Sequence, residues 1–152
     1  MKVIFLDIDG TCNYDLWYRN PERHNLQEPD LDPKCIERIN RLCELTKAKI
    51  VISSDWRYDG YYKKRLEKVG LKNIIGCTPI FQWDYYMQDL DPTRGDEINK
   101  WLEHHPKVTK YCIIDDTDDF NNEQKSYLEK INPYYGFTET NLQNCLKILN
   151  ND

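Results

Sequence analysis

The sequence predicts an α/β fold, a single domain with a three-layer, Rossmann-like open parallel sheet of about five strands and no separate cap domain. Three observations predict it. Short apolar runs alternate with longer segments of helical periodicity, as in parallel β–α–β units. The apolar runs stop abruptly at acids, serines or turn residues, as buried strands do. The 152 residues suffice for one core but not for a second large domain, so we expect residues 1–152 to form one domain.

Strands are predicted where apolar runs end at polar or turn-forming residues. The first strand covers Lys2–Leu6 (KVIFL) and is followed by acids and Gly10. The second covers Lys49–Ile52 (KIVI) and ends at two serines. Weaker apolar runs predict three more strands, over residues 73–75, 111–114 and 127–131.

Helices are predicted from apolar residues at helical spacing and from their start and stop residues. Asp32 followed by Pro33 is typical of a helix start, with an N-cap and a proline in the first turn. The helix that follows has an apolar stripe of Ile36, Ile39, Leu42, Cys43 and Leu45. Three more helices are predicted over residues 61–69, 96–105 and 140–149. Segments 11–32 and 76–93 show no clear period, and we expect irregular loops there.

The charge balance limits the class of partner. There are 21 Lys and Arg against 26 Asp and Glu, a net charge of −5, which argues against broad electrostatic binding to nucleic acid or to an anionic membrane surface. It does not exclude a local basic groove. No apolar stretch approaches the roughly 18 residues of a membrane span. The amino terminus MKVIFLDIDG has acids where a signal peptide needs an apolar core. We therefore expect a soluble, cytoplasmic protein without a membrane partner.

The cysteines argue against a disulfide framework and against a tetrahedral zinc site. They lie far apart and include no CxxC pair. In a protein without an export signal, we expect them to be reduced thiols that mostly fill the core. The six positions are Cys12, Cys35, Cys43, Cys77, Cys112 and Cys145.

Three of the predicted strands end in polar clusters. The clusters are DIDGT from Asp7, SSDWR from Ser53 and DDTDD from Asp115. Ligands of open parallel sheets bind beyond the carboxyl ends of the strands. If these strands are neighbours, at least four carboxylates converge there and repel one another unless a cation intervenes or a proton is shared. Hard oxygen ligands suit Mg²⁺, so the pattern indicates a magnesium site.

These clusters resemble the motifs of the haloacid dehalogenase superfamily of aspartate-nucleophile phosphotransferases. DIDGT matches the first motif (DxDxT), Ser53 after KIVI matches the second, and IIDDTDD matches the fourth. The motifs occur in the right order over nearly the whole chain. Segments 77–80 (CTPI) and 94–98 (RGDEI) and the pair WL at 101–102 also look like a compact branch of the superfamily, related to phosphatase domains of RNA-repair proteins.

The resemblance implies a role for each motif residue. Asp7 would be the nucleophile that takes up the phosphoryl group, and Asp9 would protonate the leaving oxygen and later deprotonate the attacking water. Ser53 would hydrogen-bond a phosphoryl oxygen. Mg²⁺ would be held by the Asp7 carboxylate, the Asp9 backbone carbonyl and Asp116, with Asp115 beside the direct ligand. The neighbouring Thr11, Ser54 and Arg57 are candidate substrate-binding residues.

One motif departs from the superfamily pattern. The third motif normally supplies a lysine that neutralises the phosphate and the nucleophile. The candidate here is Arg94, and Lys100 is a poorer one because it lies further along the helix. Arginine stays charged and can bind phosphate oxygens with its fork of donors, although its geometry differs from that of lysine. The alternative interpretation of Arg94 is an ordinary surface residue at a helix start.

Other polar residues of the motifs also have structural interpretations. Ser53 could cap the helix that follows it, a role compatible with phosphate binding. Asp118 and Asp119 are better explained as acids at a helix start than as ligands, although Asp119 could reach a metal through water.

Aromatic residues concentrate after three strand ends. They are Tyr14, Trp17 and Tyr18, then Trp56, Tyr58, Tyr61 and Tyr62, then Phe81, Trp83, Tyr85 and Tyr86. They could form a stacking surface for a nucleobase, or they could close a hydrophobic cluster under long loops, which we favour. The intervals from Asp9 to Ser53 and from Ser53 to Arg94 hold 43 and 40 residues, too few for a folded cap, so the site should be open to large substrates.

Two functions agree with this pattern. The first is a Mg²⁺-dependent phosphomonoesterase whose substrate is a phosphorylated molecule, with a nucleotide or a nucleic-acid end as one refinement. The alternative is a non-hydrolytic metal- and phosphate-binding or phospho-receiver module that acts through a partner. The second acid, Asp9, favours the enzyme, because a receiver needs no acid to expel a leaving group.

Overall fold

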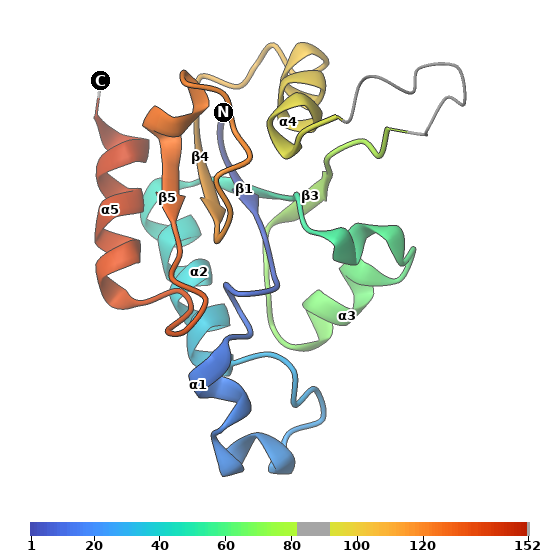
Figure 1. The fold of residues 1–152 in the computed structure, drawn as a ribbon. Helices are drawn as coiled ribbons and strands as arrows, with labels where there is room; N and C mark the ends of the chain where they lie inside the picture. Colours follow the sequence, from blue (N-terminus) through green and yellow to red (C-terminus); the bar gives the residue numbers. More distant parts are fainter. Residues whose placement is uncertain (82–91, 152) are drawn as a thin grey trace.

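The computed structural model describes residues 1–81 and 92–151 of the chain. At its centre is a sheet of five parallel strands in the order β3-β2-β1-β4-β5 (Figure 1). The strands are β1 (Lys2–Leu6), β2 (Lys49–Ile52), β3 (Ile74–Cys77), β4 (Lys110–Asp115) and β5 (Leu128–Lys130). All five overlap the predicted ranges, and the predicted open parallel sheet is confirmed.

The register of β1 with its two neighbours aligns the strand ends. Leu6, the last residue of β1, pairs with Ile52 of β2 and with Ile114 of β4. The Asp7 N–H donates to the Ile114 carbonyl over 2.9 Å. The Ser53 N–H donates to the Leu6 carbonyl over 3.0 Å. The carboxyl ends of three strands therefore meet at one level, and the residues that follow them are held at the same edge of the sheet.

Helices cover both faces of the sheet (Figure 1). They are α1 (Asp15–Tyr18), α2 (Pro33–Thr46), α3 (Tyr62–Lys68), α4 (Arg94–Glu103) and α5 (Glu139–Asn150), with 3-10 helices at Pro21–Asn25, Asp55–Tyr58 and Gln124–Tyr127. Ile4 and Leu6 of β1 belong to the core cluster that α2, α3 and α5 complete. Phe5 belongs to the cluster on the other face, where its ring meets Trp101 of α4 edge-on, with the ring centroids 5.4 Å apart. Successive residues of β1 thus pack against opposite helical layers, which gives the predicted three-layer arrangement.

The start of α2 is the one that the sequence predicts. The Asp32 side chain accepts a hydrogen bond from the Lys34 N–H over 2.9 Å, and Pro33 occupies the first helical position. The helix ends where Lys47 turns into the left-handed region at φ 61°. The apolar stripe is buried as predicted except for Leu45, which is exposed, so its inclusion in the stripe was wrong.

Two predicted boundaries differ from the structure. Segment 11–32, predicted to be irregular, contains α1 and the 3-10 helix Pro21–Asn25. A helix of four residues shows no period in the sequence, and a contact from elsewhere in the chain supports it, because the Asp15 N–H donates to the Pro133 carbonyl. Helix α4 begins two residues earlier than predicted, because Thr93 and Asp96 form a reciprocal capping box at its start.

The described residues between β1 and α4 form no separate cap domain. Between β1 and β2 lie α1, a 3-10 helix and α2, of which α2 is part of the scaffold that covers the sheet. Three predicted aromatic positions, Trp83, Tyr85 and Tyr86, lie outside the described residues. Within residues 1–81 and 92–151, no helix has both the length and the apolar character that a membrane span requires.

Candidate active site

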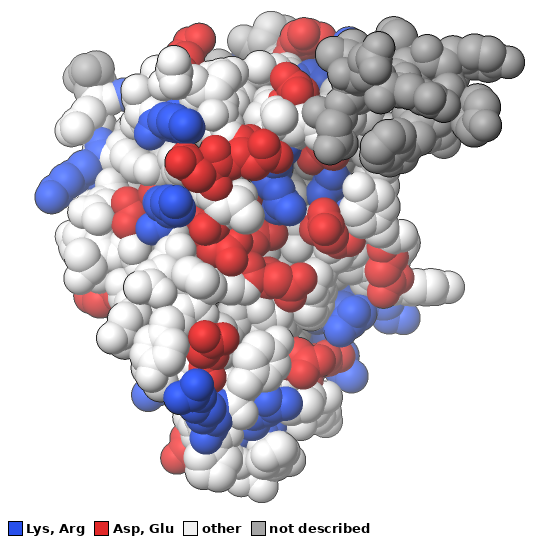
Figure 2. Space-filling model, in the orientation of Figure 1, with Lys and Arg blue, Asp and Glu red and all other residues white. Residues whose placement is uncertain are grey.

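A cavity of about 420 Å³ opens beyond the carboxyl ends of the central strands. Its lining contains five aspartates and one arginine, namely Asp7, Asp9, Asp15, Asp55, Asp116 and Arg94. Figure 2 shows acidic side chains gathered in the middle of one face of the molecule, with few basic side chains among them. The polar clusters that follow separate strands in the sequence are therefore brought together in space.

Three carboxylates form the centre of the site. Asp7, Asp115 and Asp116 each offer an oxygen, and these three oxygens lie within 4.8 Å of one another. Asp7 is the residue after β1, and Asp115 is the last residue of β4. Because β1 and β4 are paired, the strand register places the two acids side by side. Asp7 is 4% exposed and Asp115 is fully buried. The predicted convergence of the first and fourth motifs is confirmed, at a spacing that one divalent cation could bridge.

Gly10 allows the first motif to lie close to Asp116. Its backbone lies in the left-handed region, at φ 78°, which favours glycine. A Cβ atom on Gly10 would lie 2.3 Å from Oδ2 of Asp116 and 2.7 Å from its Cγ. The glycine in DIDGT is thus required by a close contact with the fourth motif as well as by its turn.

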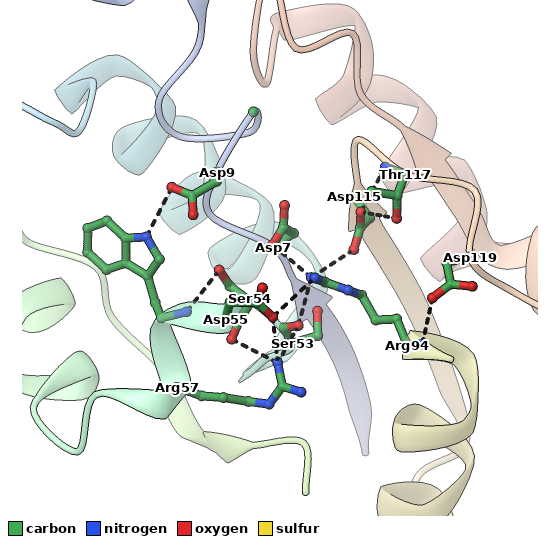
Figure 3. Close-up of polar contacts among 12 residues, drawn as sticks. Asp7, Asp9, Ser53, Ser54, Asp55, Arg57, Arg94, Asp115, Thr117 and Asp119 are labelled. Carbon is green, nitrogen blue, oxygen red and sulfur yellow. Dashed lines mark hydrogen bonds and ion pairs between the residues drawn. The ribbon is translucent and has the colours of Figure 1, made fainter. Parts of the chain in front are cut away.

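Arg94 is the cation among these acids, and it comes from the first turn of α4 (Figure 3). Its Nη1 donates to Oδ1 of Asp7 and to the backbone carbonyl of Ser53, each over 2.8 Å. The same Nη1 lies 3.3 Å from Oδ2 of Asp115, and Nη2 lies 3.5 Å from Oδ1 of Asp55. The interpretation of Arg94 as an ordinary surface residue is wrong, because its guanidinium contacts three of the acids of the site.

The balance of charge changes the acidity of the carboxyl groups. Burial raises the pKa of Asp7 to about 7, and the Asp115 carboxylate acts in the same direction against the opposing effect of Arg94. Burial and Asp115 also raise the pKa of Asp116. Burial favours the neutral form of Arg94, but Asp115 and Asp7 outweigh it and raise the pKa of the guanidinium. The single positive charge of Arg94 does not balance the negative charges of three carboxylates, whereas a bound divalent cation would supply the missing positive charge.

The two remaining candidates of the first motif have different surroundings. Asp9 is exposed in the cavity, where its Oδ1 accepts hydrogen bonds from Asn13 Nδ2 (2.7 Å) and Trp56 Nε1 (3.0 Å). Thr11 is fully buried outside the cavity lining, and its hydroxyl has no hydrogen-bond partner among the described residues. The structure therefore brings Asp9 to the site and does not bring Thr11 to the cavity surface.

The two serines of the second motif, Ser53 and Ser54, have different surroundings. Ser53 is fully buried, and its hydroxyl has no partner in the described part of the chain. Ser54 lines the cavity, and its hydroxyl accepts from the Trp56 N–H over 3.4 Å, which caps the 3-10 helix Asp55–Tyr58. The capping role predicted as an alternative for Ser53 thus belongs to Ser54. Ser53 is not among the residues that line the cavity, so its contact with a phosphoryl oxygen stays a prediction.

Comparison with protein families identifies the chain. A family model described as the HAD domain in Swiss Army Knife RNA repair proteins matches residues 3–142. The chain belongs to this family. No curated protein and no solved structure matches it significantly. The resemblance to the haloacid dehalogenase (HAD) superfamily is therefore confirmed. Membership supports a phosphohydrolase of the HAD type, and HAD domains generally use Mg²⁺, for which the acidic trio offers ligands.

Arg57 does not lie where a substrate-binding residue of a HAD site would be expected. Its side chain is 1% exposed, and its Nη2 pairs with Glu97 Oε1 of α4 over 2.5 Å. Its Nη1 donates to the carbonyls of Ser53 (3.0 Å) and Ser54 (2.9 Å). Arg57 thus links the loop after β2, through the two serine carbonyls, to Glu97 of α4. These contacts indicate that Arg57 positions the loop. They do not favour the predicted binding of substrate by Arg57, which stays a prediction.

We expect Glu97→Ala to lower the free energy of unfolding by on the order of 3 kcal/mol, because it removes the buried charged partner of the Arg57 guanidinium and leaves it only the exposed carboxylate of Asp55, 3.7 Å away. Urea denaturation measures this loss. The matched control is Glu67→Ala, which removes an exposed ion pair with Lys63 and should cost less than about 1 kcal/mol. Equal losses in the two variants would show that the buried pair does not stabilise the site.

The contacts that hold α4 against the fourth motif were missed from the sequence. The Asp119 carboxylate accepts a hydrogen bond from the Arg94 N–H over 3.0 Å. Asp119 is therefore an acid at a helix start, as predicted, but the helix is α4, which precedes it in the chain. Gln124 is 1% exposed, and its Nε2 donates to the Gly95 carbonyl and to Asn99 Oδ1, each over 2.8 Å. Nothing in the local sequence indicates Gln124, because its two partners lie 29 and 25 residues away.

Proposed function

We propose that this HAD domain is a Mg²⁺-dependent phosphomonoesterase that works through an aspartyl-phosphate at Asp7, with Asp9 as general acid and base. The observation that carries the proposal is the convergence of the Asp7, Asp115 and Asp116 carboxylates around one small volume, with the Arg94 guanidinium bound to Asp7. A nucleophile, a cation for the phosphoryl oxygens and a set of hard oxygen ligands are the parts that phosphoryl transfer requires.

Asp7 is the nucleophile in the proposed mechanism. It lines the cavity, and Arg94 binds its Oδ1, so one orientation of the carboxylate is held. In the first step a carboxylate oxygen of Asp7 forms a bond to phosphorus while the bond from phosphorus to the leaving oxygen breaks. The charge on the transferred phosphoryl oxygens is then neutralised by Arg94, with the buried hydroxyl of Ser53 as a further donor.

Asp9 transfers the proton in both steps of the proposed mechanism. It is exposed in the same cavity, two residues from the nucleophile. In its protonated form it gives a proton to the leaving oxygen as the aspartyl-phosphate forms. The resulting carboxylate then takes a proton from the water that attacks phosphorus and releases inorganic phosphate, which restores the Asp7 carboxylate.

The residues present fit a magnesium ion. The three carboxylates offer hard oxygens within 4.8 Å of one another. Oδ2 of Asp115 is buried without a hydrogen bond from any described residue, although Arg94 Nη1 lies 3.3 Å from it as an ion pair. The other oxygen of Asp115 accepts from the Thr117 N–H and hydroxyl, which fixes this side chain. The ligands would be Asp7, Asp116 and the Asp9 carbonyl, with Asp115 beside them. When bound, the ion would supply positive charge for the phosphoryl oxygens.

The substrate that we propose is a nucleotide or a nucleic-acid end. The matching family is named for RNA repair proteins. At the rim of the cavity, Tyr18 is 46% exposed and stacks with Arg23, whose guanidinium carbon lies 4.9 Å from the ring centroid. Arg19 and the partly exposed Tyr134 form a second such pair at 5.7 Å. Aromatic rings paired with arginines suit the stacking of bases and contact with phosphates.

Phosphate release from a panel of substrates tests the proposal. With Mg²⁺, we expect turnover of phosphomonoesters, and we expect chelation to lower the rate by at least about 100-fold until Mg²⁺ is restored. Uptake of a single phosphoryl group from acetyl phosphate without turnover would instead support the phospho-receiver module. Equal rates on 3′-phosphorylated oligonucleotides and on sugar phosphates would contradict the nucleic-acid end as the substrate.

A further inference from the structure

We infer that Asn13 and Trp56 are positioning residues for Asp9, which bind one oxygen of its carboxylate so that the other oxygen is left to exchange a proton in the cavity. The inference rests on the proposed function, because it concerns the acid and base step assigned to Asp9. Asn13 lies outside the three polar clusters, and Trp56, although part of SSDWR, received no role in the chemistry from the sequence. Their roles follow from the contacts that the fold creates around Asp9.

Both donors bind the same carboxylate oxygen. Asn13 Nδ2 lies 2.7 Å from Asp9 Oδ1, and Trp56 Nε1 lies 3.0 Å from it. No residue in the described ranges donates to Oδ2 of Asp9, although the side chain lines the cavity. Two donors on one oxygen fix the rotation of the carboxyl group, because turning it would break both hydrogen bonds. The oxygen that remains for proton transfer is therefore Oδ2.

The orientation of the Asn13 amide is determined by its second contact. The Gly10 N–H lies 2.9 Å from Asn13 Oδ1. A backbone N–H can only donate, so the atom that faces it must be the amide oxygen, and the NH₂ group must then face Asp9. Asn13 is 3% exposed, which keeps its amide from turning towards solvent. The contact also ties Asp9 to the same turn in which Gly10 packs against Asp116.

The Trp56 indole is held just as firmly. Its backbone N–H is bound by the Ser54 hydroxyl at the start of the 3-10 helix Asp55–Tyr58. Its ring packs against the hydrophobic core on one side, and the Arg65 guanidinium carbon lies 4.3 Å from the ring centroid. The indole N–H is a donor and never an acceptor. The two groups that bind Asp9 are thus in place before a substrate arrives, as pre-organised catalysis requires.

Trp56→Phe tests the inference with two kinds of leaving group. The change removes the indole N–H and keeps an aromatic ring against the core and Arg65. p-Nitrophenyl phosphate releases a stable anion that needs no proton, whereas β-glycerophosphate releases an alkoxide that must be protonated. We expect kcat/KM for β-glycerophosphate to fall about 10- to 100-fold. For p-nitrophenyl phosphate we expect little change. kcat/KM reports the formation of the aspartyl-phosphate only, so its later hydrolysis does not enter the comparison.

Two further variants make the result specific. Tyr58→Phe is the matched control, because it removes a polar atom from an exposed aromatic side chain of the same 3-10 helix, and it should leave both substrates unaffected. Asn13→Ala removes the donor to Asp9 without adding a charge beside it, and it should reproduce the selective loss of Trp56→Phe. Thermal unfolding of each variant shows whether the fold is kept. A purely structural role would lower both substrates in the same proportion.

Asp9→Asn separates the inference from the proposed function. If Asp9 is the acid, this variant loses about 10²- to 10⁴-fold on β-glycerophosphate and far less on p-nitrophenyl phosphate. If Asp9→Asn shows that selective loss but Trp56→Phe and Asn13→Ala do not, the inference is overturned and the proposed function stands. If Asp9→Asn affects both substrates equally, the acid role of Asp9 fails and the inference fails with it.

Discussion

An Asp7→Asn variant is expected to lose turnover of every phosphomonoester by about 10⁴-fold or more, because an amide oxygen cannot take up a phosphoryl group as a stable ester. Asparagine has nearly the same shape as aspartate, and its oxygen can still accept from Arg94 Nη1, the contact that now measures 2.8 Å. The fold should therefore be kept. Phosphate release measures the loss, and circular dichroism verifies the fold. Turnover close to that of the unmodified protein would refute Asp7 as nucleophile.

The same variant should be more stable than the unmodified protein when metal is removed at neutral pH. Burial and the neighbouring Asp115 raise the pKa of Asp7 in the folded protein to about 7, above the ordinary value of 3.8. Between these two values the folded state binds more protons at this site than the unfolded state does. The stability that this difference contributes is fully present below pH 4 and is lost as pH rises through 7. Asparagine does not titrate, so it escapes this loss.

Thermal unfolding with a chelator, from pH 4 to pH 8, measures the difference between Asp7→Asn and the unmodified protein. The advantage of the variant should be small at pH 4 and should grow towards pH 7. Asp118→Asn is the control, because the Asp118 side chain is 55% exposed and pairs only loosely with Lys125, at 3.6 Å. A difference that does not change with pH would show that Asp7 is not the group that titrates.

The gathering of acids could be predicted because it depends on strand ends. In a parallel sheet, neighbouring strands finish at the same edge, so Asp7 and Asp115 had to meet once β1 and β4 were neighbours. The sequence alone does not give that strand order. The prediction was therefore conditional on these strands being neighbours, and the structure shows that they are. Arg94 could be proposed from the position that the third motif normally occupies.

The contacts of single side chains could not be predicted, because they depend on partners that are distant in the sequence. Arg57 looks like a phosphate ligand beside the second motif, but Glu97, 40 residues away, binds it below the loop. Thr11 looks exposed in a polar motif, but the turn at Gly10 directs it into the core. The Trp56 indole is typical of a packing residue, and only the folded turn shows that its N–H reaches Asp9.

Replacing Arg94 should have the second largest effect. Arg94→Met removes the one guanidinium that contacts Asp7, Asp115 and the Ser53 carbonyl, and we expect kcat/KM to fall about 10²- to 10³-fold at neutral pH. Two physical effects act together. The phosphoryl group loses a positively charged donor, and the carboxylate of Asp7 loses the cation that lowers its pKa, so a larger fraction of the nucleophile is protonated.

Arg94→Lys distinguishes the charge of this residue from its shape. Lysine restores the charge that related enzymes use at this step, but its single ammonium group replaces a planar fork, so we expect activity within about tenfold of the unmodified protein, the equivalent of one charged hydrogen bond. Lys100→Met, at the poorer candidate for the third-motif cation, should leave the rate unchanged, because that side chain pairs with Glu103 on the exposed face of α4. If Lys100→Met were as damaging as Arg94→Met, Lys100 would be the catalytic cation and the contacts of Arg94 would be structural. If Arg94→Lys were as inactive as Arg94→Met, the fork, and not the charge, would be what Asp7, Asp115 and the phosphoryl group require.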